Sequence, residues 1–71
     1  MNMQPKYTVI AEYILWGSDW NRPEVDSFYR DTLEGVSECA AREYKRGSVV
    51  RVSFVDNETG VSRNIARGEV V

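Results

Sequence analysis

Few residues in this chain could carry out catalysis, and histidine, the most common general base in enzymes, is absent. The 71 residues include no histidine, and Cys39 is the one cysteine. A Ser-His-Asp or Cys-His arrangement is therefore impossible, as are the zinc sites that need histidine ligands. A single cysteine also cannot form an intramolecular disulfide. We expect a protein that is not an enzyme and that has no catalytic residue, metal site or cofactor.

Cys39 and the acidic residues are the remaining candidates for reactivity. Cys39 falls within a predicted helix beside Val36 and Ala40, where a buried and inert thiol is expected. The acids around residues 19–26 do not have the spacing of a calcium loop, although a weak cation site is the alternative to a solvated acidic loop. The five glycines stand singly, so no phosphate-binding glycine loop is present.

The clearest binding signals lie in and after a polar loop at residues 17–23. Trp20 stands between two polar residues, so its ring either folds back over the core or is offered to a partner, as tryptophan often is at interfaces. Six acids and two arginines give residues 19–38 a local charge of −4. We expect this acidic region to dock on a basic groove of another protein, with a solvated rim as the alternative. The predicted partner-binding residues are Asp19, Trp20, Glu24 and Asp26.

Positive charge is concentrated further along the chain, where residues 39–51 have a local charge of +3. The net charge of the whole chain is −2, which differs from the basic footprint typical of nucleic-acid-binding proteins. A solvated positive face is therefore favoured, and weak nucleic-acid binding is the alternative function. The residues of this alternative nucleic-acid face are Arg42, Arg46, Arg51, Arg63 and Arg67.

Four strands and one helix are predicted to position these side chains. Residues 7–16, 24–30, 48–55 and 61–67 are rich in β-branched and aromatic residues and predict strands, although Pro23 could instead begin a helix at 24–31. Val50, Val52 and Phe54 are expected on one face of the third strand. A hairpin loop with Gly60 in the left-handed conformation is expected at 56–60.

The helix is predicted at residues 32–46. Asp31 is the expected N-cap, and Gly47 is the expected left-handed residue after the last turn. The apolar stripe consists of Leu33, Val36, Ala40 and Tyr44. The whole chain, residues 1–71, is therefore expected to form a single small α+β domain of order ββαββ, with one helix packed on a small antiparallel sheet.

This element order resembles that of small phage-encoded proteins that inhibit host machinery. The matching residues are Thr32 and Leu33 at the helix start, Ala40 and Ala41 within it, and the apolar residues of the following strand. Phage inhibitors of bacterial RNA polymerase and small anti-CRISPR proteins look similar in order and size. The resemblance implies a phage- or prophage-type accessory protein that binds a host protein complex, and it carries no functional residue across.

The first residues lack the basic region and apolar run of a signal peptide, and no apolar stretch is long enough to span a bilayer. A cytoplasmic protein without a membrane partner is therefore expected. The predicted function is that of a non-catalytic protein-interaction module, an inhibitor or accessory protein. Besides nucleic-acid binding, a structural homodimer joined at an open sheet edge is a further alternative.

Overall fold

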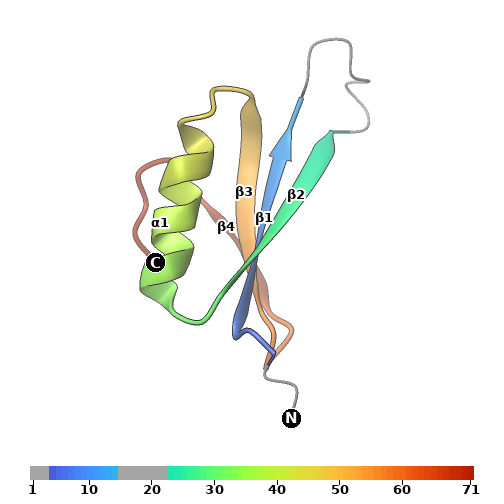
Figure 1. The fold of residues 1–71 in the computed structure, drawn as a ribbon, viewed down its shortest axis with the longest axis vertical. Coiled ribbons are helices and arrows are strands. Elements are labelled where there is room, and N and C mark those ends of the chain that lie inside the picture. The colour runs from blue at the N-terminus through green and yellow to red at the C-terminus, as the bar shows by residue number, and fades with distance from the viewer. Residues whose placement is uncertain (1–3, 15–22) are drawn as a thin grey trace.

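The computed structural model describes residues 4–14 and 23–71 of the chain. Four antiparallel strands form one sheet, and one helix packs against one face of it (Figure 1). The strands are β1 (Tyr7–Tyr13), β2 (Glu24–Arg30), β3 (Val49–Asp56) and β4 (Ser62–Ile65), and the helix α1 spans Leu33–Tyr44 between β2 and β3. The predicted α+β fold of order ββαββ is confirmed, and residues 24–30 form a strand rather than a helix.

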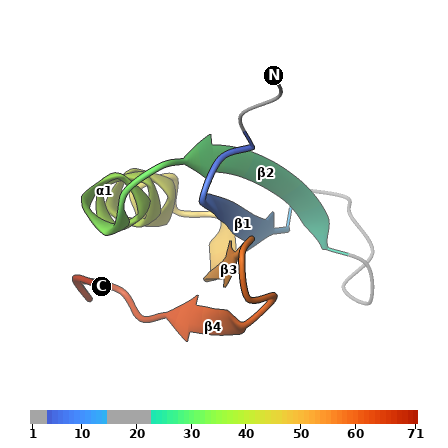
Figure 2. The same cartoon turned by 90° about the horizontal axis from the view of Figure 1, so that it is seen from below.

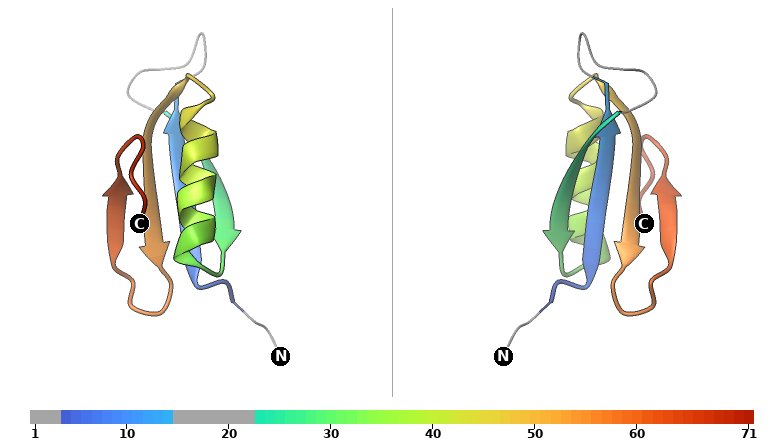
Figure 3. Two further views of the ribbon diagram at one scale, coloured as in Figure 1. Left: turned by 90° about the vertical axis from the view of Figure 1, so that its left-hand side faces the viewer. Right: turned by 90° about the vertical axis from the view of Figure 1, so that its right-hand side faces the viewer.

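The strand order in the sheet is β2-β1-β3-β4, so β1 lies inside the sheet between β2 and β3. The helix covers one face of the sheet, and no other described element covers the opposite face (Figures 2 and 3). The two edges are β2, with seven residues, and β4, with four. Among the described helical residues, none belongs to a helix that is long and apolar enough to cross a bilayer.

The helix begins one residue later than predicted. Thr32, rather than Asp31, is the N-cap: its backbone is extended, and its hydroxyl accepts a hydrogen bond from the Gly35 N–H at 3.0 Å. A Cβ at Gly35 would lie 3.2 Å from this hydroxyl and 3.3 Å from Arg30 Cδ, so the glycine allows α1 to start close to the end of β2. After the last turn, Gly47 has the predicted positive φ, 79°.

The core lies between α1 and the sheet and is made of small and β-branched side chains. Val36, Cys39, Ala40 and Glu43 form the buried face of the helix, with the spacing of one helical stripe. The prediction for Leu33 is therefore wrong: it is 42% exposed. Tyr44 packs against the core, and its hydroxyl donates a hydrogen bond to the Ile65 carbonyl. The buried hydrophobic residues are Val9, Ala11, Val36, Cys39, Ala40, Val49, Val52 and Ile65.

A β-bulge in β3 changes which valines are buried. Glu12 pairs with Arg51, whereas the next residue of β1, Tyr13, pairs with Val49, so Val50 is the extra residue. Val49 and Val52 are buried, and Val50 between them is 55% exposed. The predicted common face of Val50, Val52 and Phe54 is therefore wrong for Val50, because an inserted residue breaks the alternation of side chains along a strand.

Both ends of the β3–β4 hairpin are also placed by the structure. Gly60 has the predicted positive φ, 78°, and its N–H donates to the Asp56 carbonyl at 2.7 Å. β4 ends at Ile65, before the predicted end of the last strand. The chain then turns, with the Glu69 N–H donating to the Ala66 carbonyl at 3.0 Å, and its last residues run back along α1 (Figure 1).

Candidate functional site

The residues of the predicted acidic surface have different environments. Asp19 and Trp20 lie outside the described residues. Glu24 is exposed at the start of β2. Asp26 instead accepts hydrogen bonds from Arg46, at 3.1 Å, and from the Tyr13 hydroxyl, at 3.5 Å. Asp26 is thus held by contacts within the fold, and Glu24 is the more accessible of the two described acids.

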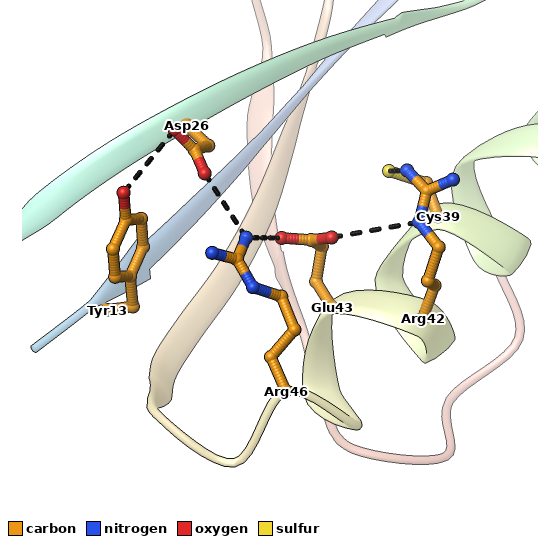
Figure 4. A network of polar contacts seen from close by, with 6 residues as sticks. All are labelled: Tyr13, Asp26, Cys39, Arg42, Glu43 and Arg46. Atoms are coloured by element: carbon orange, nitrogen blue, oxygen red, sulfur yellow. Dashed lines mark hydrogen bonds and ion pairs between the residues drawn. The ribbon is translucent and has the colours of Figure 1, made fainter. Parts of the chain in front are cut away.

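A polar network joins β2 to the last turn of α1 (Figure 4). Arg46 lies between Asp26 and Glu43, at 3.1 and 2.6 Å from their carboxylate oxygens. Glu43 is only 3% exposed, and its other oxygen lies 3.7 Å from Arg42. A buried carboxylate needs such partners because removing a charged group from water has a large desolvation penalty. The hydrogen bond to Glu43, and after it the bond to Asp26, raises the pKa of the Arg46 guanidinium.

The arginines of the predicted nucleic-acid face do not share one surface. Arg51 lies on the uncovered face of the sheet, where its guanidinium donates to Glu12 at 2.6 Å. Arg63 pairs across the sheet with Phe54, which packs on the core at the helix side. Because directly opposite residues share a face, Arg51 and Arg63 lie on opposite sides of the sheet.

Four of these arginines cover aromatic rings at the edge of the core. The guanidinium carbons lie 4.8–5.8 Å from the ring centroids, within the range of a cation–π contact. Arg67 also donates to the Tyr44 carbonyl at 3.0 Å. Sequence reasoning missed these cation–π contacts, and the only sign of them in the sequence is that several arginines occur in a chain rich in aromatic residues. The pairs are Arg42 with Phe28, Arg46 with Tyr13, Arg63 with Phe54, and Arg67 with Tyr44.

A groove lies on the helix side of the sheet, between the start of α1, the β3–β4 hairpin and the last residues of the chain. Its volume is about 590 Å³. Leu33, Val61 and Val70 line it and are 42%, 65% and 82% exposed, and Phe54 contributes a half-buried ring. Apolar side chains gathered in an open concavity are typical of a binding site for another molecule.

The charged side chains of the groove are already engaged. Arg63 pairs with one carboxylate oxygen of Glu69 at 2.7 Å, and the other oxygen accepts the Ala66 N–H at 2.9 Å. Asp56 accepts hydrogen bonds from the backbone N–H groups of Glu58 and Thr59, at 2.9 and 3.4 Å. The polar atoms of the groove are therefore hydrogen-bonded within the fold, and one negative charge, that of Asp56, has no cationic partner among the lining residues. The exposed surface between these groups is apolar, which suits an apolar ligand group.

The last residues of the chain form one wall of the groove and are held against α1 by contacts of Val71. The Val71 N–H donates to the Ser37 hydroxyl of α1 at 2.9 Å, and Val71 packs against the core. Gly68, with φ of 81°, turns the chain toward the helix. Sequence reasoning missed this groove, because the alternation pattern has no means of showing that a short apolar segment after a glycine folds back on a helix.

Cys39 has the environment predicted for it. Its side chain is 2% exposed, and burial raises the pKa of its thiol above the ordinary value of 9.0, although Arg30 and Arg42 act in the opposite direction. The thiolate is the reactive form. We expect a thiol reagent at mildly alkaline pH to modify the native protein at least ~10-fold more slowly than the urea-unfolded protein. Equal rates in the two states would contradict the buried position.

The same shift predicts how stability depends on pH. The folded protein keeps the Cys39 proton to a higher pH than the unfolded chain does, so stability falls as pH rises above about 9. Urea denaturation from pH 8 to pH 10.5 should therefore show a steeper loss in the wild type than in Cys39→Ala. Identical pH dependence in the two proteins would remove the thiol as the cause.

No cluster of three or more cysteine, aspartate or glutamate side chains within 4–14 and 23–71 could hold a metal ion. Comparisons of the chain with protein-family models, with curated proteins and with solved structures give no match. A function for this protein is therefore inferred from the geometry and chemistry of the surface formed by residues 4–14 and 23–71.

Proposed function

We propose that this protein is a non-catalytic protein-interaction module whose groove receives apolar side chains of another protein. The observation that supports this most is the exposure of Leu33, Val61 and Val70 within one concavity. Covering apolar surface is favourable by ~25 cal/mol per Å², and interface hot spots form where an apolar anchor fills a pocket that is already present. The hydrogen bond of Val71 to Ser37 places this wall before a partner binds, which lowers the ordering that binding requires.

The class of partner follows from the resemblance to small phage-encoded inhibitors. We propose a phage- or prophage-type accessory protein that binds a bacterial protein complex. The predicted surface at Asp19, Trp20, Glu24 and Asp26 is then a second contact. Glu24 pairs with Tyr13 at one end of the sheet, and Asp56 of the groove pairs with Tyr7 at the other. The two proposed contacts are therefore far enough apart to be tested separately.

The arrangement of the arginines favours a protein partner over a nucleic acid. Arg46, Arg51 and Arg63 each form an ion pair within the fold, and they are divided between the two sides of the sheet. Nucleic-acid binding needs uncompensated positive charge along one surface. We expect no shift of DNA or RNA in a low-salt electrophoretic assay, and a shift that weakens steeply with salt would favour the alternative function.

Site-specific photocrosslinking in bacterial lysate tests the groove. A photoreactive residue at Val61 and one at Val70 should crosslink to the same protein. The matched control is the same photoreactive residue at Ala41, which is exposed on α1 and does not line the groove. Crosslinks to a different protein from Glu24 alone would assign the interaction to the acidic region, and crosslinks from Ala41 but neither valine would contradict the groove.

A further inference from the structure

We infer that two copies of this protein join through the outer edge of β2, antiparallel and centred on Ser27, so that their sheets become one continuous sheet. This pairing goes beyond the proposed function, because it uses the edge of the sheet away from β3 and β4, whereas the groove lies beside those strands. Of the proposed second contact it uses Glu24, which in the dimer faces the second copy rather than another protein. The occupant of the edge is a second copy of this chain.

The first step is to find which backbone groups of β2 point outward. The Ile14 N–H donates to Ser48, which precedes β3, and the Lys6 carbonyl accepts from Asn57, which follows β3. Even-numbered residues of β1 therefore bond toward β3, and odd-numbered ones toward β2, because the direction alternates along an antiparallel strand. Tyr7 and Val9 pair with Arg30 and Phe28, so the even-numbered residues of β2 bond inward.

The N–H and C=O groups of Val25, Ser27 and Tyr29 are consequently directed away from β1. An independent contact agrees with this assignment: the Tyr29 carbonyl accepts a hydrogen bond from Arg30 Nη1 at 2.7 Å, on the exposed side of the strand. An edge that carries such groups is normally protected by proline, by charged side chains (lysine above all) or by a bulge. β2 contains no proline and no lysine, and its charged residues, Glu24, Asp26 and Arg30, are all among those that bond toward β1. Its pairing with β1 shows no bulge.

A second copy of β2 matches this edge when Ser27 lies opposite Ser27 of the second copy. The outward residues then form hydrogen-bonded pairs, with Val25 opposite Tyr29 of the second copy and the reverse. These two side chains are 53% and 61% exposed in one copy, and an aromatic residue opposite a β-branched one is a favourable cross-strand pair. The whole length of β2 takes part in this register.

Charge also favours a second copy over an unrelated strand. In the same register Glu24 lies opposite Arg30 of the second copy, and the two-fold symmetry gives this opposite-charge pair twice. The Tyr29 carbonyl accepts the N–H of Val25 of the second copy, so Arg30 no longer needs to bond that carbonyl and can reach the carboxylate. β4 offers a weaker edge because it has only four residues.

Variants that exchange the charges of Glu24 and Arg30 test the pairing, with sedimentation velocity over a concentration series as the measurement. The wild type should form dimers at the higher concentrations. Glu24→Arg alone and Arg30→Glu alone should each weaken the dimer at least ~10-fold, since each places like charges opposite each other twice, and the double exchange should restore it. Circular dichroism shows whether each variant is folded, and Ser27→Pro, which removes an outward N–H only, should be a folded monomer.

A wild type that stays monomeric at every concentration overturns the dimer, as does a folded double exchange that fails to recover it. The two proposals can fail independently. Ser27→Pro should leave photocrosslinking from Val61 and Val70 unchanged, and Val61→Asp should leave the dimer unchanged. Loss of the groove crosslinks in a folded Ser27→Pro variant would show that binding at the groove depends on dimer formation.

Discussion

Ile65→Ala should leave most molecules unfolded at physiological temperature. Ile65 is 1% exposed and heads the fully buried side chains in volume. It pairs with Val52 across β3 and β4, and its carbonyl accepts a hydrogen bond from the Tyr44 hydroxyl. Truncating a buried isoleucine to alanine costs ~2–5 kcal/mol, and a chain of this length has only ~3–5 kcal/mol of stability from its core. Urea and thermal denaturation followed by circular dichroism measure the loss.

Two milder variants control for this result. Ile65→Val should cost ~1 kcal/mol, because only one methylene is lost. Val50→Ala should change stability by less than ~0.5 kcal/mol, since Val50 is 55% exposed at the bulge. If Ile65→Ala unfolds at the same urea concentration as Val50→Ala, Ile65 does not hold β4 on the core.

Val61→Asp combined with Val70→Asp should weaken binding of the partner at least ~100-fold and leave the fold intact. A contact at an interface hot spot contributes ~2 kcal/mol or more, and each ~1.4 kcal/mol is tenfold in affinity. The new carboxylates would stand beside Asp56 and Glu69 in the groove, where an apolar partner would have to desolvate them. Both valines are mostly exposed in the free protein, so folding should change little.

Val50→Asp is the matched control for the groove variant. It introduces a carboxylate at an exposed valine of a strand that does not line the groove, and it adds one negative charge where the double variant adds two, so it is compared with Val61→Asp alone as well. Unchanged binding by Val50→Asp and lost binding by the double variant would place the contact in the groove. Equal loss in both would point instead to a general effect of negative charge.

The fold could be predicted from sequence because its periodic signals are strong. Alternating β-branched residues identify the strands, and the helix is bounded by a capping residue and Gly47. The N-cap was missed by one position because Asp31 and Thr32 both carry a suitable oxygen, and only the hydrogen bond to Gly35 distinguishes them. Fold class depends on many residues together, so such an error at a boundary has no effect on it.

The buried face of the helix was harder to predict because it includes a charged residue. Glu43 can be buried because two arginines close to it in sequence pair with its carboxylate: Arg42, the preceding residue, and Arg46, three residues later. A hydropathy pattern assigns glutamate to the surface, so it leaves Glu43 out of the apolar stripe. It includes Leu33 instead, although this side chain is 42% exposed. The exposure of Val50 has a similar origin, since a bulge is a property of strand pairing rather than of local sequence.

The candidate surfaces depend on contacts between residues far apart in the chain. Asp26 and Arg46 were placed in opposing charged regions by their order in sequence, yet they form one ion pair. Phe54 and Val70 are likewise brought into one groove only when the last residues fold back. Composition correctly gave the charges of these regions, but it could not show which charges neutralise each other.

The most direct test of the protein-binding function is calorimetric titration of the crosslinked partner, once purified, at several temperatures and salt concentrations. Burial of the groove residues predicts a negative heat-capacity change and a groove contribution to the affinity that varies little with salt, because apolar contact is not screened. The affinity should fall for Val61→Asp/Val70→Asp and not for Val50→Asp. Binding that weakens steeply with salt, shows no heat-capacity change and is unaffected by the groove variant would contradict the proposed site.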